Sequence, residues 1–359
     1  MAGGRFEVAG CRLRFEVPAA SKLSSRASSV VIPSVERGIF DAQTLKSIWR
    51  IGLFLVVLLS GVPLHADFRV FEALPVDPAL EIELSDIAGK ILTRFAPSKL
   101  TRENLAITLI DLSGKAPRRA SYQGRIPFHP ASVVKLFYLV YGYNLIHRNQ
   151  LTLDMALQQG FTDMIVDSGN DATSYVVDRI TGTTSGPELW GEAFKTFVDA
   201  RNGPNRYYKA MGYDISANGK TWCEGLYGRE KQIFGPNREN RNRFTSDSFA
   251  ALMLSIATRH AVSPASDEAM LRLLRRPISG EPGTDGGQAK EFTGESLPPG
   301  SKLWSKAGWT SEVQHDLAYV ELPNGRRYVL AAMTRGAAED KTILPEISRE
   351  IVGLMSGKP

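Results

Sequence analysis

The sequence predicts an α/β fold of the α+β type. In this fold terminal helices flank a mainly antiparallel sheet of about five strands, and an all-helical lobe is inserted between the strands. Strand-like runs occur in two separate regions, before residue 130 and after residue 300, and the stretch between them has a mostly helical pattern. Because the two strand regions must meet to form one sheet, the sheet lobe takes in about residues 67–130 and 300–359, and the helical lobe about 131–299. We expect a ligand-binding cleft between the lobes.

The first elements of this domain are predicted to be a helix and a β-hairpin. Asp77 is a suitable N-cap and Pro78 a suitable first helical residue. The apolar residues that follow recur with the 3.6-residue period of one buried face. They are Leu80, Leu84, Ile87, Ile91 and Phe95. Residues 104–114 and 118–128 then have the pattern of two strands joined by a tight turn at Gly114.

The middle of the chain is predicted to be mainly helical. Helical patterns are clearest in five segments, at residues 131–147, 152–160, 171–181, 187–200 and 245–258. Residues 201–244 are rich in Asn, Gly, Arg and Tyr without a period, which predicts a long loop of the kind that is often functional. Residues 279–300 form a Gly- and Pro-rich connection.

Three strands and a closing helix are predicted for the C-terminal region. The strand-like runs are KLWSKAGWT, HDLAYVEL and RRYVLAAMTRG, with a Pro-Asn-Gly turn between the last two. Thr342 is a suitable cap for the final helix, in which Ile347, Ile351 and Leu354 share one face. This face is expected to cover the sheet together with the N-terminal helix.

A signal peptide is predicted at residues 45–66, within a leader that occupies residues 1–66. Lys46 and Arg50 precede an apolar run from residue 51 to about residue 62, and Ala66 is a small residue at the expected cleavage point. The run is shorter than the roughly 20 apolar residues that a transmembrane helix needs. We therefore expect a cleaved leader and a periplasmic or secreted protein. The 44 residues before the signal show no period, so translation starting near residue 45 is an alternative.

Composition argues against a nucleic-acid partner. The pI near 9.1 comes from the leader, where residues 1–66 carry eight Lys and Arg against four Asp and Glu. The rest of the chain holds 35 of the 43 basic and 34 of the 38 acidic residues, so it has almost no net charge. The two cysteines are Cys11, in the leader, and Cys223. An exported mature chain would keep one cysteine and form no internal disulfide.

Ser132 and Lys135 form the only S-x-x-K sequence in the 359 residues. At positions i and i+3 they share one face of a helix, and the first turn places the serine beside unpaired backbone N–H groups. Nearly every following residue is apolar, which predicts a central helix and a buried lysine. Burial lowers the pKa of a lysine, and a neutral lysine can activate a serine hydroxyl. The alternative is a chance match in which Ser132 only caps the helix.

Two further short motifs carry polar groups at suggestive places. Ser168 and Asn170 stand at the entrance of a predicted helix, where such residues also serve as simple caps. Lys306 and Gly308 share one side of a predicted strand, and the glycine permits close approach of a ligand. An ordinary edge-strand lysine would give the same pattern.

Taken together and in this order, the three motifs resemble those of the serine β-lactamase and penicillin-binding protein superfamily, and most of all those of class A β-lactamases. That group is characterised by S-x-x-K, S-D-N and K-T-G motifs. The resemblance covers roughly residues 77–356, including the split sheet and its helical insert. It implies that Ser132 is the acylated nucleophile and Lys135 its base or proton relay. The expected partner is a β-lactam or a cell-wall D-alanyl peptide, with a monomeric protein and no cofactor.

The resemblance also implies roles for the other motif residues. Ser168 would pass a proton to the leaving nitrogen, Asn170 would bind the amide side chain of the substrate, and Lys306 with Gly308 would line its carboxylate subsite. The backbone N–H groups of Ser132 and Trp309 would form the oxyanion hole.

Departures from the family pattern put hydrolysis in question. The middle motif has Gly169 in place of aspartate, and the third has Ala307 in place of the usual hydroxyl residue, for which Thr310 is a weak substitute. Class A enzymes use a glutamate on a long loop to activate the deacylating water, and Glu230 stands at a suitable distance before Thr245. Phe234, however, replaces the asparagine that supports this glutamate. Two other glutamates are rivals for the role, Glu224 and Glu239.

Three functions are consistent with this pattern. The first is a serine hydrolase that acts on a β-lactam, and the second is an acylated peptidase or esterase with slow deacylation. The third is a non-catalytic module that binds a wall peptide or a partner protein. A Ser-His-Asp triad is disfavoured because His315 and Asp316 are adjacent in one predicted strand and point to opposite faces. The five histidines form no pair at metal-ligand spacing, so no metal is expected.

Overall fold

The computed structural model describes residues 66–220, 227–278 and 287–357. The predicted signal peptide, the rest of the leader and the segment that contains Cys223 and Glu224 lie outside the described residues. No helix in the described part of the chain is both long enough and apolar enough to cross a lipid bilayer.

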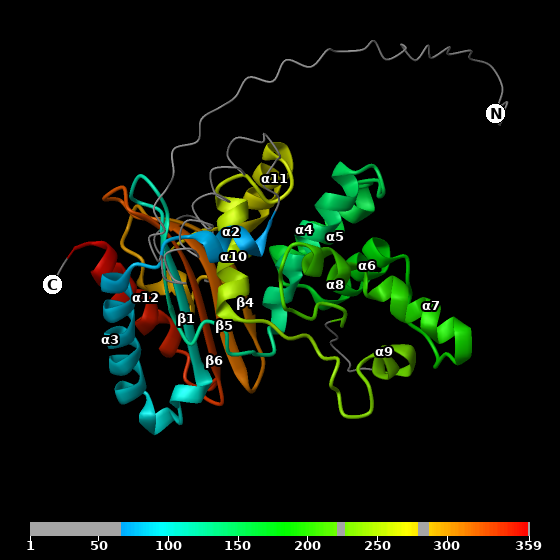
Figure 1. Cartoon of the computed structure of the whole chain (residues 1–359), viewed down its shortest axis with the longest axis horizontal. Helices are drawn as coiled ribbons and strands as arrows, with labels where there is room; N and C mark the ends of the chain where they lie inside the picture. The colour runs from blue at the N-terminus through cyan, green and yellow to red at the C-terminus, as the bar shows by residue number, and fades with distance from the viewer. Residues whose placement is uncertain (1–65, 221–226, 279–286, 358–359) are drawn as a thin grey trace, which may run out of the picture. The chain divides into compact units, whose positions relative to one another are not determined.

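A six-stranded antiparallel sheet forms the centre of the sheet lobe, in the order β2-β1-β6-β5-β4-β3 (Figure 1). Its strands are β1 (Leu105–Asp111), β2 (Arg118–Tyr122), β3 (Arg275–Arg276), β4 (Lys302–Trp309), β5 (Val313–Glu321) and β6 (Arg327–Arg335). The direct pairing of β1 with β6 confirms that the two strand regions meet in one sheet. The predicted hairpin is also present, since β1 pairs with β2 from Asp111 opposite Arg118 onward.

One face of the sheet is covered by the terminal helices, α3 (Pro78–Arg94) and α12 (Ile343–Met355), which lie side by side in Figure 1. The side chain of Asp77 accepts hydrogen bonds from the N–H groups of Ala79 and Leu80, as its predicted N-cap role requires. Leu84, Ile87 and Ile91 are buried among the strand residues of this face. The predicted cover of the sheet is thus observed.

The opposite face packs against α10 (Ser246–Ala257), which contacts β1, β5 and β6. Thr245 and Ser248 form a capping box at its start. Residues of α10 and of α4 (Val134–His147) belong to one hydrophobic cluster, so this second core continues from the sheet into the helical lobe. Helix α10, which belongs to the predicted helical insert, therefore covers the second face of the sheet.

The remaining helices build the lobe around α4 and the flank of α10. They are α2 (Phe68–Ala73), α5 (Met155–Ile165), α6 (Asn170–Thr181), α7 (Gly191–Arg201), α8 (Gly203–Ala210), α9 (Gly228–Ile233) and α11 (Pro264–Leu274). Figure 1 shows α4, α5, α6, α7 and α8 together on the side of α10 that faces away from the sheet. Helix α4 is apolar nearly all round, and ten of its residues are buried, as a central helix requires.

Two sequence-based expectations need correction. The sheet has six strands instead of five, because the two residues of β3 pair with β4 and are too short to give a periodic signal. Residues 201–244 are not a continuous loop, since they contain α8 and α9. These helices have eight and six residues, and short helices owe their stability to packing, here through the buried Tyr208 and Ile233, more than to propensity.

Candidate active site

The turn that carries Ser132 is held in an uncommon backbone conformation. Ala131 has a φ of 45°, in the left-handed region that disfavours residues with a Cβ, and Ser132 follows in a short 3₁₀ turn that leads into α4. His315 of β5 accepts a hydrogen bond from the N–H of Thr334 at Nδ1, so its Nε2–H donates to the carbonyl of His129 at 2.8 Å. This hydrogen bond ties the turn before α4 to strand β5 of the sheet.

Gly308 of β4 lies directly against this turn. A Cβ at this position would stand 2.8 Å from the nitrogen of Ser132, 2.9 Å from that of Val133 and 3.0 Å from the oxygen of Pro130. Real Cβ atoms do not approach other atoms so closely, so only glycine allows this contact between strand and turn. The glycine of the third motif therefore sets the distance between β4 and the serine.

Lys135 is fully buried one helical turn after the serine. Its Nζ donates to the carbonyl and, at 3.2 Å, to the hydroxyl of Ser168, and to Oδ1 of Asn170 at 2.8 Å. Burial lowers the pKa of Lys135 to about 7. A large fraction of these side chains is therefore neutral and able to accept a proton near neutral pH. The hydrogen bonds of Lys135 Nζ among the described residues do not include one to Ser132 Oγ.

Ser168 lies between two lysines. Its φ of 58° turns the chain just before α6, and its hydroxyl is 3.2 Å from Lys135 Nζ and 3.0 Å from Lys306 Nζ. Gly169, which replaces the usual aspartate, caps α6 and donates its N–H to the carbonyl of Asp163 at 2.9 Å. The structure thus brings the first, second and third motifs into one cluster.

Lys306 is fully buried, and Gln288 is one of its partners. Lys306 Nζ contacts Oε1 of Gln288, the carbonyl of Ala307 at 2.7 Å and the hydroxyl of Ser168. Burial, together with the nearby charges of Lys135 and Arg276, holds the pKa of Lys306 well below its usual value. Sequence reasoning did not single out Gln288 or Arg276, since neither stands in a motif.

The geometry of β4 places the N–H group of Trp309 on the edge of the strand that faces the turn of Ser132. In an antiparallel strand the N–H and C=O groups of alternate residues point to the same edge. Those of Ala307 point away from β5, because they bond to Gln288 Oε1 at 3.2 Å and to Lys306 Nζ. Trp309, two residues further, therefore directs its N–H to that same edge, beside the nitrogen of Ser132 that Gly308 approaches. Trp309 as a whole is 48% exposed.

Thr310 stands at the end of β4, in the turn before β5. Its hydroxyl accepts from the N–H groups of Glu312 at 3.0 Å and Val313 at 3.2 Å. Among the described contacts of Lys306 none involves Thr310, and the role of Thr310 as a weak substitute for the hydroxyl missing at Ala307 stays a prediction.

Glu230 is placed in a buried ion-pair cluster. Its two carboxylate oxygens accept from the guanidinium of Arg201 at 2.6 and 2.8 Å, and one of them also accepts from Ser185 at 3.1 Å. Arg201 and Glu230 are both fully buried, and Asp178 and Lys220 complete the cluster. No contact of Glu230 with the three motifs occurs among the described residues. A role as water-activating base stays a prediction, and the geometry favours a structural role.

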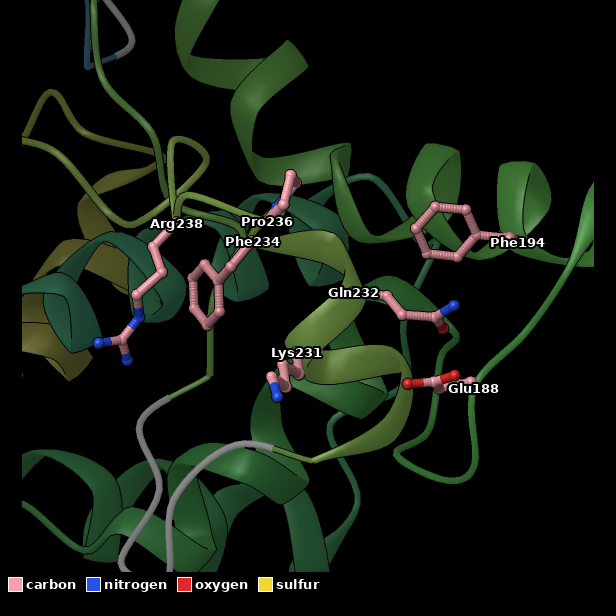
Figure 2. Close-up of a pocket in the computed structure, with 8 residues that line it drawn as sticks. Glu188, Phe194, Lys231, Gln232, Phe234, Pro236 and Arg238 are labelled. Atoms are coloured by element: carbon pink, nitrogen blue, oxygen red, sulfur yellow. The ribbon is translucent and has the colours of Figure 1, made fainter.

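The other candidates for this base differ in setting. Glu239 is exposed and accepts from the N–H of Asn237 at 2.9 Å, and Glu224 lies outside the described residues. Phe234 is buried beside Gly219 and lines a pocket of about 670 Å³ between α7 and α9. Figure 2 shows the rings of Phe194 and Phe234 on opposite sides of this pocket, with Gln232 between them. The pocket includes no residue of the three motifs.

Neither a triad nor a metal centre emerges from the part of the chain that the structure describes. His315 packs toward the turn of Ser132, whereas Asp316 accepts from the N–H of Thr293 on the other face of the sheet. This opposite placement agrees with the sequence-based argument. No group of three or more His, Cys, Asp or Glu side chains in the described ranges is placed to hold a metal ion.

Comparisons with known proteins agree with the fold and the motif cluster. The fold, the motif cluster and the comparisons place the chain in the serine β-lactamase and penicillin-binding protein superfamily. The chain belongs to the Beta-lactamase enzyme family, whose match covers residues 154–355. This match begins after Ser132, which is a candidate nucleophile because of its motif and its place in the fold. No curated protein matches the chain.

Solved structures of this superfamily share the fold. PBP-A is 19% identical, with 79% of this chain and 98% of the other covered and a TM-score of 0.54. A β-lactamase from Sphaerobacter thermophilus DSM 20745 is 18% identical over 77% of this chain and 98% of its own, also with a TM-score of 0.54. A class A β-lactamase of the last common ancestor of Gram-negative bacteria is 16% identical over 75% and 98%, with a TM-score of 0.56.

Proposed function

We propose that the protein is an exported serine hydrolase that forms an acyl-enzyme on Ser132, with a β-lactam as the favoured class of substrate. The observation that carries this proposal is the buried Lys135, whose pKa is about 7 and whose Nζ contacts both Ser168 and Asn170. A base with a pKa near the working pH is the one that general-base catalysis favours. Membership of the Beta-lactamase enzyme family supports the same chemistry.

Acylation follows from the positions of these groups. Neutral Lys135 takes the proton of Ser132, and Ser132 Oγ forms a bond to the carbonyl carbon of the substrate. The N–H groups of Ser132 and Trp309 stabilise the oxyanion that develops. Ser168 then gives its proton to the leaving nitrogen and receives one from Lys135 as the carbon–nitrogen bond breaks. Lys135 and Ser132 share a helix face, and substrate binding would close the remaining distance between them.

A second candidate function is acylation with slow deacylation, as in a penicillin-binding peptidase or an esterase-like enzyme. It is favoured by Glu230, whose two oxygens are both occupied by Arg201 and whose contacts do not reach the motif cluster. No carboxylate in the described part of the chain hydrogen-bonds Ser132, Lys135 or Ser168. Hydrolysis of the acyl-enzyme would then proceed without a strong base.

One experiment separates these functions. Purified protein is mixed with a chromogenic cephalosporin and with a fluorescent penicillin, and Ser132→Ala serves as the control. Steady colour release supports a β-lactamase, whereas a lasting fluorescent label without turnover supports slow deacylation. If the protein releases no colour and retains no label, acylation of these probes is contradicted, and a non-catalytic binding module is favoured.

A further inference from the structure

Gln288 connects the two halves of the candidate active site. Its Oε1 accepts from Lys306 Nζ and, at 3.2 Å, from the N–H of Ala307 on β4. Its Nε2 donates to the carbonyls of Ile165 at 2.9 Å and Val166 at 2.7 Å, at the end of α5. The side chain is 6% exposed, and every hydrogen-bonding group of its carboxamide has a partner. Such complete pairing of a buried amide fixes its position.

These contacts leave Lys306 with no free donor. A protonated lysine has three N–H groups, and Lys306 Nζ has three acceptors, namely Ser168 Oγ, Gln288 Oε1 and the carbonyl of Ala307. A ligand carboxylate at Lys306 would have to replace one of them. Ala307 offers no hydroxyl in compensation, and its N–H at this edge is already bound by Gln288.

A second positively charged side chain, that of Arg276, lies near Lys306. Arg276 is buried beside Lys306, but its Nε donates to the carbonyl of Ser305 at 3.2 Å and its terminal nitrogen to that of Ile165 at 2.8 Å. Both side chains are therefore already bound by carbonyl groups, and Lys306 also by the Gln288 amide. An incoming carboxylate would lose its own hydration and find all three contacts of Lys306 Nζ and two of the five N–H groups of Arg276 already taken.

We propose that Gln288 is a specificity-determining residue that occupies the carboxylate subsite beside Lys306 and selects acyl donors without a carboxylate at this place. The oxygen of its amide takes the contacts that a carboxylate oxygen would make. The inference rests on the proposed acyl transfer at Ser132 and narrows its substrate class to neutral amides, lactams and esters. Donors with a carboxylate react after displacement of Gln288 and are therefore slower.

A matched pair of probes tests this inference. One probe is a chromogenic cephalosporin with its free carboxylate, and the other is the methyl ester of the same compound. The second-order rate constant for acylation is measured for each probe with the wild-type protein and with Gln288→Ala. We expect the wild type to favour the ester, and the ratio of the acid rate to the ester rate to rise about tenfold or more in the variant, since Lys306 regains a donor.

The ratio within one protein does not depend on the fraction of active molecules, so partial unfolding of the variant does not affect it. Gln288→Ser, which also shortens the side chain but keeps a polar group, is expected to raise the ratio of the acid rate to the ester rate as well. An unchanged ratio in both acylated variants would overturn the inference and leave the proposed function intact. If neither probe acylates any of the three proteins, the proposed function fails, and the inference fails with it.

Discussion

At the scale of single residues, the chemistry of the site depends on the environment of Lys135. The side chain is fully buried, and desolvation is the cause that lowers its pKa to about 7. A solvated lysine with its usual pKa near 10.4 would be almost entirely protonated at neutral pH and unable to take the proton of Ser132. Burial of Lys135 in the apolar helix α4 therefore supports its proposed role as the base for Ser132.

The pH dependence of acylation follows from this pKa. Lys135 is protonated and inactive as a base below about pH 7 and becomes neutral as the pH rises through about 7. We expect the acylation rate of Ser132 to increase about tenfold per pH unit well below this value and to level off above it. Stopped-flow measurement of labelling by a fluorescent penicillin between pH 5 and 9 checks this. A rate that falls as the pH rises through 7 would contradict the assignment.

Glu230 provides a second residue-scale prediction. Replacing it by glutamine leaves the buried guanidinium of Arg201 without its main counter-charge, and we expect a loss of about 3 kcal/mol in the free energy of unfolding. The exposed Glu239 is the matched control, and Glu239→Gln is expected to change stability by less than about 0.5 kcal/mol. Urea denaturation measures both effects.

The lifetime of the acyl-enzyme decides the role of Glu230 in catalysis. A structural carboxylate leaves the lifetime nearly unchanged in the folded Glu230→Gln protein. If the variant instead keeps its stability and holds the acyl group at least tenfold longer, Glu230 is the deacylating base, and the structural interpretation is wrong.

The three motifs could be found in the sequence because the spacing within each is local, and the structure brings them into one cluster. Ser132 and Lys135 lie one helical turn apart, and their chemistry follows from that spacing and from the apolar sequence around them. Gln288 and His315 could not be assigned in this way. Their contacts reach across more than 100 residues of sequence, to Ile165 and to His129, and no periodic pattern marks such partners.

At the scale of elements, the contact of β4 with the turn before α4 positions Ser132, the proposed nucleophile. We predict that Gly308→Ala lowers the acylation rate about 100-fold, because the added Cβ would meet the nitrogen of Ser132 at 2.8 Å and move the serine. Gly353→Ala in α12 is the control. A Cβ there has no atom within 4 Å, and this helix-interior change is expected to stabilise the protein by up to about 1 kcal/mol.

Comparison of the labelling rates of the two glycine variants tests the contact. Both proteins are first shown to be folded by circular dichroism. Equal labelling of Gly308→Ala and wild type would contradict a close approach of β4 to Ser132.

Elements with long periodic patterns were predictable, whereas short ones were not. The Asp-Pro start of α3 predicted its first residue, and its apolar period predicted its buried face. Helices α8 and α9 have only a few residues each, and β3 has two, so their sequences hold too few apolar positions to define a period. These elements are determined by tertiary contacts, such as the packing of Tyr208 beneath Phe137.

At the scale of the whole molecule, the residues on either side of the predicted cleavage point, Ala66 and Asp67, both form hydrogen bonds within the domain. The N–H of Ala66 bonds to the carbonyl of Ala261 at 3.2 Å, and Asp67 caps α2 through the N–H of Arg69 at 2.9 Å. We predict that the exported protein starts at or near Asp67. N-terminal sequencing of protein from the periplasm or the medium checks this, and a mature chain that starts well before Asp67 would contradict cleavage at Ala66.

The account as a whole depends on one covalent bond, that between Ser132 and the acyl group of the substrate. Mass spectrometry of the intact protein after incubation with a penicillin, followed by peptide mapping, measures it directly. We predict a mass increase equal to that of the whole penicillin, because opening of the ring releases no fragment, with the modification on the peptide that contains Ser132 and none in Ser132→Ala. A modification on another residue, or the same mass increase in Ser132→Ala, would contradict the assignment of the nucleophile.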